Sequence, residues 1–139
     1  MIIQGRISKT HVAAIEYFAS QLFSWQLKTY IGIRILFRKN IPDLGYTEVE
    51  DYNSKDKPRE FILEINRSQS EEEILKTIAH EMVHCKQYAY DQMDEQGTRW
   101  LNNKVDYDSL PYYERPWEIE AETVGNKLYE EFKLLQKAK

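Results

Sequence analysis

Two histidines and a glutamate near the middle of the chain have the types and spacing that hydrolytic chemistry needs. The segment His80-Glu81-Met82-Val83-His84 carries two imidazoles four residues apart. Side chains with that spacing project from one face of an α-helix, so both rings can reach one metal ion at about 2.0–2.1 Å. This H-E-x-x-H pattern predicts a zinc ion (Zn2+) held by His80 and His84, with Glu81 as the base that takes a proton from the metal-bound water.

The alternative for this segment is a solvent-facing helix that carries two unrelated histidines. An apolar face that would anchor the helix on a sheet argues against it; its members are Ile74, Ile78, Met82, Cys85 and Ala89. Cys85 follows His84 directly, but its place on this apolar face predicts core packing rather than metal binding.

A catalytic zinc site usually has a third protein ligand and one open position. His11 lies far upstream and is expected to be a surface residue. Three acids near a later helix start, Glu118, Glu120 and Glu122, are better candidates. In a helix, Glu118 and Glu122 share a face with Gly125, which would permit close approach to a neighbouring helix, and Glu120 points roughly opposite. Acids in a first helical turn also complement the helix dipole at the surface, so their spacing allows both interpretations.

Taken together, HEMVH and the later EIEAE resemble the gluzincin pattern of zinc metallopeptidases, H-E-x-x-H with a later E-x-x-x-D/E helix. The region from Phe61 to about Phe132 is also similar to small SprT-like and phage-encoded metallopeptidase domains. The resemblance implies Glu118 as the third zinc ligand. It implies that the acid four residues on supports a ligand histidine; here this is Glu122, where many relatives have Asp.

The same resemblance implies a mode of substrate binding. The strand before the motif helix, Phe61 to Asn66, would be a sheet edge along which a peptide or protein substrate lies in extended form. Main-chain hydrogen bonds would then supply affinity, and alternate side chains would supply selectivity.

The motif needs elements to position it, and the sequence patterns predict them. Apolar residues recur at helical spacing from about Thr10 to Leu27, after Ser8 or Thr10 as a cap. Alternation predicts strands over Ile31–Arg38, Tyr46–Tyr52 and Phe61–Asn66, with a loop from Asn53 to Pro58. Ser70 and Glu73 form a capping-box pattern for a helix from about Glu71 to Met93. Asp94–Tyr113 reads as a long loop, and Pro116 opens a last helix whose apolar stripe runs from Trp117 to Leu135.

These elements predict one α+β domain over residues 1–139. It consists of an N-terminal helix, a small three-stranded sheet, the motif helix, a loop and a C-terminal ligand helix, an arrangement that the resemblance makes zincin-like.

Composition narrows the functional classes. The formal charge is −4, which argues against a nucleic-acid partner because such proteins usually carry a basic patch. No apolar run is long enough to span a membrane, and one cysteine cannot form an intramolecular disulfide. A cytoplasmic protein without a membrane partner is therefore expected.

The predicted function is a zinc metallopeptidase. Two alternatives stay open: a zinc-dependent hydrolase of a non-peptide bond, and a non-catalytic zinc-binding interaction module. Tyr112 or Tyr113, just before the ligand helix, could assist by hydrogen bonding to the developing oxyanion. With ten tyrosines in the chain, packing or surface exposure is the competing interpretation for either one.

Overall fold

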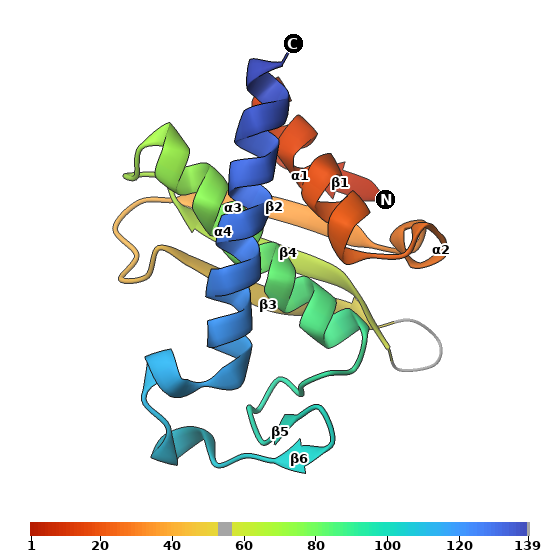
Figure 1. The fold of residues 1–139 in the computed structure, drawn as a ribbon, viewed down its shortest axis with the longest axis vertical. Helices are drawn as coiled ribbons and strands as arrows, with labels where there is room; N and C mark the ends of the chain where they lie inside the picture. The colour runs from red at the N-terminus through yellow and green to blue at the C-terminus, as the bar shows by residue number, and fades with distance from the viewer. Residues whose placement is uncertain (53–56, 139) are drawn as a thin grey trace.

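The computed structural model describes residues 1–52 and 57–138, which form an α+β domain (Figure 1). The elements are, in order, β1 (Ile2–Gln4), α1 (Lys9–Leu22), α2 (Trp25–Lys28), β2 (Gly32–Arg38), β3 (Gly45–Tyr52), β4 (Pro58–Asn66), α3 (Glu71–Ala89), β5 (Arg99–Trp100), β6 (Asn103–Lys104), two 3-10 turns (Tyr107–Ser109 and Tyr112–Glu114) and α4 (Pro116–Lys137). Of the loop predicted from Asn53 to Pro58, residues 53–56 lie outside the described part of the chain.

The main sheet has four strands in the order β1-β2-β4-β3, one more than the sequence predicted. β1, β2 and β4 run parallel, and β3 is antiparallel to β4. The missed strand, β1, has three residues, which is too short for a period-2 pattern to be recognised.

The expectation that Phe61–Asn66 forms a sheet edge is wrong. These residues belong to β4, which pairs with β2 on one side and β3 on the other. The alternation of Phe61, Leu63 and Ile65 predicts that one face of the strand is buried, and this prediction is confirmed. It carries no information about the number of neighbouring strands, because both edges of a strand use main-chain groups. The edges of this sheet are β1 and β3.

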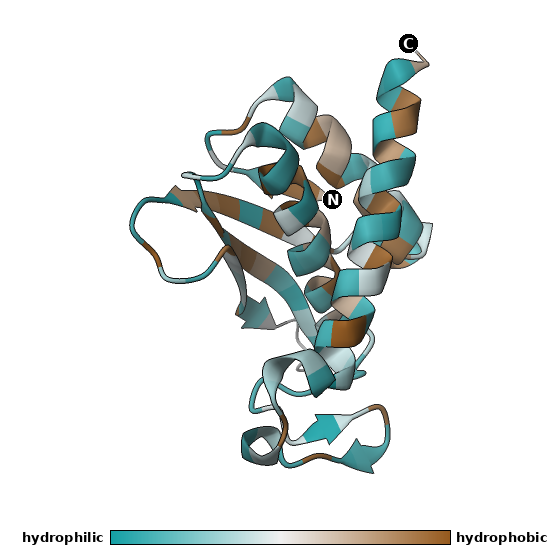
Figure 2. Ribbon diagram, turned by 60° about the vertical axis from the view of Figure 1, so that its left-hand side comes forward, coloured by the Kyte–Doolittle hydropathy of each residue, from teal (hydrophilic) through white to brown (hydrophobic). Residues whose placement is uncertain are grey.

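Helix α3 lies on the sheet against β3 and β4, α1 lies beside it, and α4 crosses over α3 (Figure 1). Hydrophobic and hydrophilic residues alternate along these elements, as expected where each has one buried face (Figure 2). The inward residues of the strands and helices form one core; its fully buried members include Phe18, Ile33, Ile35, Leu63, Ile78 and Met82.

The first predicted helix, Thr10 to Leu27, is two helices. Ser8 caps α1 by accepting a hydrogen bond from the His11 amide, and Phe23 ends it. Ser24 then starts a new helix, because its side chain accepts from the Leu27 amide. The motif helix begins after Ser70 as predicted and ends at Ala89, four residues earlier than expected.

The segment predicted as a long loop, Asp94–Tyr113, contains a short hairpin of β5 and β6 and the 3-10 turns. It packs on the start of α4: the rings of Trp100 and Tyr107 each lie 6.3 Å from the Trp117 ring. The buried stripe of α4 ends at Phe132, and Leu135 is 46% exposed. No helix in the described residues is long and apolar enough to cross a membrane.

Candidate metal centre

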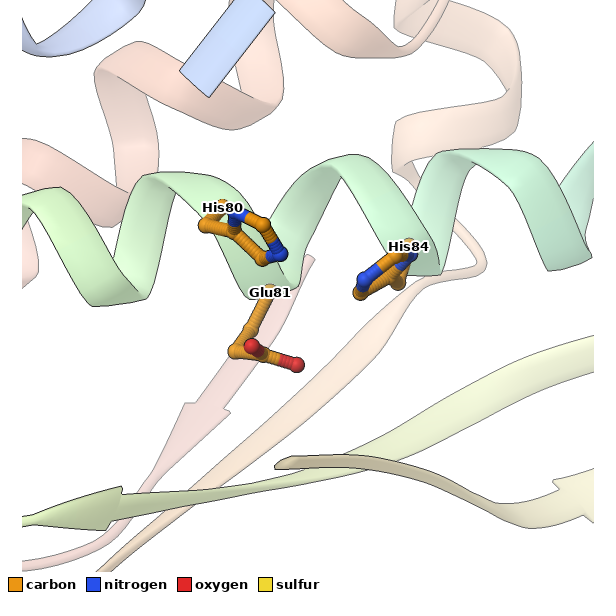
Figure 3. A group of neighbouring side chains, drawn as sticks. All are labelled: His80, Glu81 and His84. Atoms are coloured by element: carbon orange, nitrogen blue, oxygen red, sulfur yellow. The ribbon is translucent and has the colours of Figure 1, made fainter. Parts of the chain in front are cut away.

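His80 and His84 lie on successive turns of α3, with ring centroids 5.0 Å apart. Glu81 projects from the same stretch of helix toward the sheet (Figure 3). One ligand atom from each of the three residues lies within 4.8 Å of the others. His84 and Glu81 are buried, and His80 is partly buried. The predicted cluster is therefore present, and it could hold a metal ion.

Glu118, in the first turn of α4, brings a carboxylate to the same point. Its Oε1 lies 3.0 Å from His80 Nε2 and 2.9 Å from His84 Nε2. Two ligands of a tetrahedral zinc ion at about 2.0–2.1 Å are roughly 3.3 Å apart. The two distances from Glu118 Oε1 are thus within a few tenths of an ångström of those in a tetrahedral ligand set. Two imidazoles and a carboxylate suit zinc and several other divalent metals, so these donors do not fix the identity of the metal.

The local charges keep Glu118 ionised. Burial acts to raise the pKa of this carboxyl, but hydrogen bonds from His80 and His84 and their charges lower it well below its usual range. For His84, burial acts to lower the pKa, while the hydrogen bond to Glu118 and the charges of Glu81 and Glu118 outweigh it and raise the pKa to about 9. The centre is consequently a place where positive charge is stabilised.

Glu81 is held by a residue from the sheet. The Thr47 hydroxyl on β3 lies 2.7 Å from Glu81 Oε1 and 3.0 Å from the Glu81 carbonyl oxygen. Thr47 and Glu81 are both buried. Gly45, two residues earlier, lets the strand come close, because a Cβ there would lie 3.2 Å from Glu81 Cγ and 2.5 Å from Thr77 Cγ2. The carboxylate is thus fixed in orientation, and it is not among the groups that contact Glu118.

Gln87, one turn beyond His84, fixes the orientation of that ring. Gln87 is fully buried, and its Oε1 lies 2.7 Å from His84 Nδ1. Its Nε2 donates to the Trp117 carbonyl oxygen at 2.9 Å and to Glu120 Oε1 at 3.0 Å. Since both of those groups can only accept, the amide oxygen is the atom that faces His84, and Nδ1 carries the proton. His84 Nε2 is thereby left to act toward Glu118 and a metal.

The other two acids of α4 meet the expectation only in part. Glu122 was expected to support a ligand histidine, but its Oε2 is 3.5 Å from His80 Nδ1 and its side chain is 69% exposed. Glu120 points away from His80, as expected. It contacts α3 instead, because it accepts hydrogen bonds from Gln87 and, at 3.1 Å, from Lys86. Glu122 thus lies beside His80 without a hydrogen bond, and the hydrogen bond that supports the other histidine, His84, comes from Gln87.

Gly125 brings the two helices together, as its place on the Glu118 face predicted. A Cβ at this position would lie 3.1 Å from both the Cα and the amide nitrogen of His80. The backbone of α4 therefore passes directly over the turn of α3 that carries His80.

Two tyrosines just before α4 behave differently. The Tyr112 hydroxyl lies 3.5 Å from His80 Nε2. Its pKa is raised, by burial first and then by the charge of Glu118, so the hydroxyl keeps its proton and can donate it in a hydrogen bond. Tyr113 is 75% exposed and makes no described contact with the site. Of the pair, the structure brings only Tyr112 to the centre.

Cys85 and His11 lie outside this cluster. Cys85 is fully buried in the core, as predicted. His11 was expected at the surface but is 8% exposed, because its ring folds back on the first turn of α1, where Nδ1 accepts from the Ser8 amide at 3.4 Å.

Sequence reasoning missed Thr47 and Gln87. Gln87 could have been suspected, because residues three apart share a helix face, so His84 and Gln87 are neighbours. For Thr47, the only indication in the sequence is that alternation along the strand directs its side chain toward the interior.

The comparisons with known proteins add no relative: no protein-family profile, no curated protein and no solved structure matches this chain.

Proposed function

We propose that this chain is a zinc-dependent metallopeptidase. The observation that carries the proposal is the meeting of His80 Nε2, His84 Nε2 and Glu118 Oε1 beside a separate, oriented carboxylate, Glu81. A purely structural metal site has no use for a second carboxylate beside its three ligands, whereas hydrolysis needs a base at that place. The resemblance of HEMVH and EIEAE to the gluzincin pattern supports the same assignment.

His80, His84 and Glu118 would hold the ion. Bound zinc would supply Lewis acidity, which lowers the pKa of water and polarises a carbonyl group. Glu81, held by Thr47, takes one proton from the attacking water as its oxygen adds to the carbonyl carbon. When the C–N bond breaks, Glu81 returns this proton to the leaving nitrogen. Tyr112 donates a hydrogen bond to the carbonyl oxygen as negative charge develops on it.

The proposed substrate is a peptide or unfolded protein segment, bound in extended form along β3 rather than β4. β3 pairs with β4 on one side and with no other strand of the described chain. It also carries Thr47, whose side chain contacts Glu81, so β3 is the edge strand that touches the base. An extended peptide could add to this edge through main-chain hydrogen bonds.

The test combines metal analysis with proteolysis of an unstructured protein. We expect one zinc per chain in the native protein and in Glu81→Gln, with cleavage by Glu81→Gln reduced by about 10²–10⁴-fold. Glu130→Gln, an exposed acid near the far end of α4, is the matched control and should leave cleavage unchanged. Near-native turnover of Glu81→Gln would remove the base from the mechanism. Zinc binding without cleavage of any peptide would favour another bond or a non-catalytic module.

A further inference from the structure

A cavity of about 670 Å³ is lined by residues at the carboxyl ends of β1, β2 and β4 and at the starts of α1 and α3. These three strands run parallel, so their carboxyl ends meet at one edge of the sheet. Crevices outside the carboxyl ends of parallel strands are common ligand sites, and this volume suits a small molecule.

The cavity is rich in arginine although the chain is acidic overall. Arg6 follows β1, Arg38 ends β2 and Arg67 follows β4, and all three line the cavity. Among the described residues, the side chains of Arg6 and Arg67 have no ion-pair or hydrogen-bond partner. Arg38 Nε is 3.7 Å from Glu64 Oε1, a weak contact between side chains that are 51% and 32% exposed.

A backbone feature places Arg6 at this edge. Gly5 has φ +130°, and a Cβ there would collide with the carbonyl oxygen of Ile35. The chain therefore crosses directly over β2 as it leaves β1, a path that only glycine permits at this position. Ser8, the N-cap of α1, also lines the cavity, and the first turn of that helix carries no acidic residue.

His11 adds a buried donor to the lining. Its Nδ1 accepts from the Ser8 amide, so Nε2 carries the ring proton. Nε2 lies 2.8 Å from Glu71 Oε1, but without hydrogen-bond geometry, so this buried N–H has no acceptor in line. Glu71 is 57% exposed at its side chain and is the acidic group nearest this donor. Set against the carboxylates of Glu71 and Glu64, the arginines leave a net positive charge.

We propose that this cavity binds a small organic anion, a phosphate or carboxylate group attached to an apolar body. Arginine guanidinium groups match the geometry of phosphate and carboxylate, and three arginines from separate segments line this cavity. Phe37 and Ile74 give the cavity an apolar wall that the charged group alone would not use. The site shares no lining residue with His80, His84 and Glu118, so the proposal does not depend on the metallopeptidase assignment.

The test is a titration of the metal-depleted protein with phenyl phosphate, monitored through the NMR chemical shifts of the backbone amides. We expect saturable 1:1 binding with shifts centred on Gly5, Arg6 and Arg38, and weaker binding of inorganic phosphate and of benzyl alcohol, each of which offers half of the ligand. Benzoate in a parallel titration distinguishes carboxylate from phosphate recognition. Arg6→Gln and Arg67→Gln should each weaken phenyl phosphate binding about tenfold, as expected for the loss of one charge-assisted hydrogen bond.

Arg34→Gln is the matched control, because Arg34 lies on β2 and pairs with Glu50 at 3.1 Å but does not line the cavity. It should bind phenyl phosphate like the native protein. Absence of saturable binding, or an equal loss in Arg34→Gln, would overturn the proposal. Shifts at His80 and His84 in place of Gly5 and Arg6 would overturn it as well. Tighter binding of an oligonucleotide, with shifts spread beyond the cavity, would replace the small anion by a nucleic acid.

Discussion

Gln87 joins groups from two helices: the ring of His84 on α3, and the main chain of Trp117 and the carboxylate of Glu120 on α4. It is fully buried between α3 and α4, so water cannot replace it at low cost. The histidine ligand and the start of the helix that carries Glu118 are therefore oriented by the same amide.

Replacing Gln87 by Met keeps the side-chain volume but removes the acceptor for His84 Nδ1–H. We expect zinc affinity to fall by 10–100-fold, the usual effect of losing the group that orients a metal-binding histidine. Competition with a chromophoric chelator measures the affinity, and the ¹⁵N shifts of the His84 ring report the tautomer. The double variant Gln87→Glu/Glu120→Gln, which restores an acceptor for the ring, should recover most of the affinity. Failure of this rescue, with the fold intact, would mean that Gln87 acts through packing alone.

The acids of α4 form a graded series. Glu118→Ala should abolish tight zinc binding, because its Oε1 is the oxygen that meets both histidines. Glu120→Ala should weaken binding modestly through Gln87, and Glu122→Ala should do least, because Glu122 is exposed. The spacing argument alone predicts the opposite order for the last two. Zinc titrations of the three variants decide between the orders, and a larger loss for Glu122→Ala would restore the spacing argument.

At the scale of single residues, the sequence predicts those parts of the site that depend on spacing within one helix. His80, Glu81 and His84 lie within two turns of one helix, so their common position follows from helical geometry. Thr47 reaches Glu81, and Glu120 reaches Gln87, only through packing between elements more than thirty residues apart. Those contacts depend on how the elements dock, which no local pattern encodes.

At the scale of whole helices, Gly125 sets how closely α4 approaches α3. Gly125→Ala gains about 1 kcal/mol of helix propensity, but its Cβ meets the His80 backbone, which cannot rotate away as a side chain could. We expect little or no net stabilisation and a clear loss of zinc affinity, because the ligand helices move apart. Thr123→Ala, at an exposed position of the same helix, should change affinity little. Urea unfolding and zinc titration of both variants provide the comparison. Unchanged affinity in Gly125→Ala would show that the contact is not needed for the site.

The strength of each pattern decided which elements the sequence could predict. The motif helix and the last helix have long apolar stripes and clear start signals, Ser70 and Pro116, and both were found. β1 has three residues, and the break at Ser24 depends on a cap inside an otherwise helical run. The order of strands follows from pairing between distant segments, so no pattern within Phe61–Asn66 tests the edge position that the resemblance implies for this strand.

For the molecule as a whole, the core and the metal centre are separable. Phe18, Ile33, Leu63 and Ile78 are fully buried, and none of them is a proposed metal ligand. Removal of zinc with a chelator should therefore leave the far-ultraviolet circular dichroism spectrum nearly unchanged. The melting temperature should fall, because a ligand at 100 times its Kd stabilises the folded state by about 2.7 kcal/mol. Collapse of the spectrum on chelation would show instead that the metal is required for folding.

The proposed metal ligands are divided between two helices, and this division has a kinetic consequence. His80 and His84 belong to α3 and Glu118 to the first turn of α4, next to the small β5–β6 hairpin. Local unfolding of this first turn alone would remove Glu118 from the ion while the core stays folded. Escape of the ion would then follow the free energy of a local opening, which lies below that of global unfolding. Amide hydrogen exchange at Glu118 and Ile119 would measure that opening directly, and metal would slow exchange there far more than at Leu128.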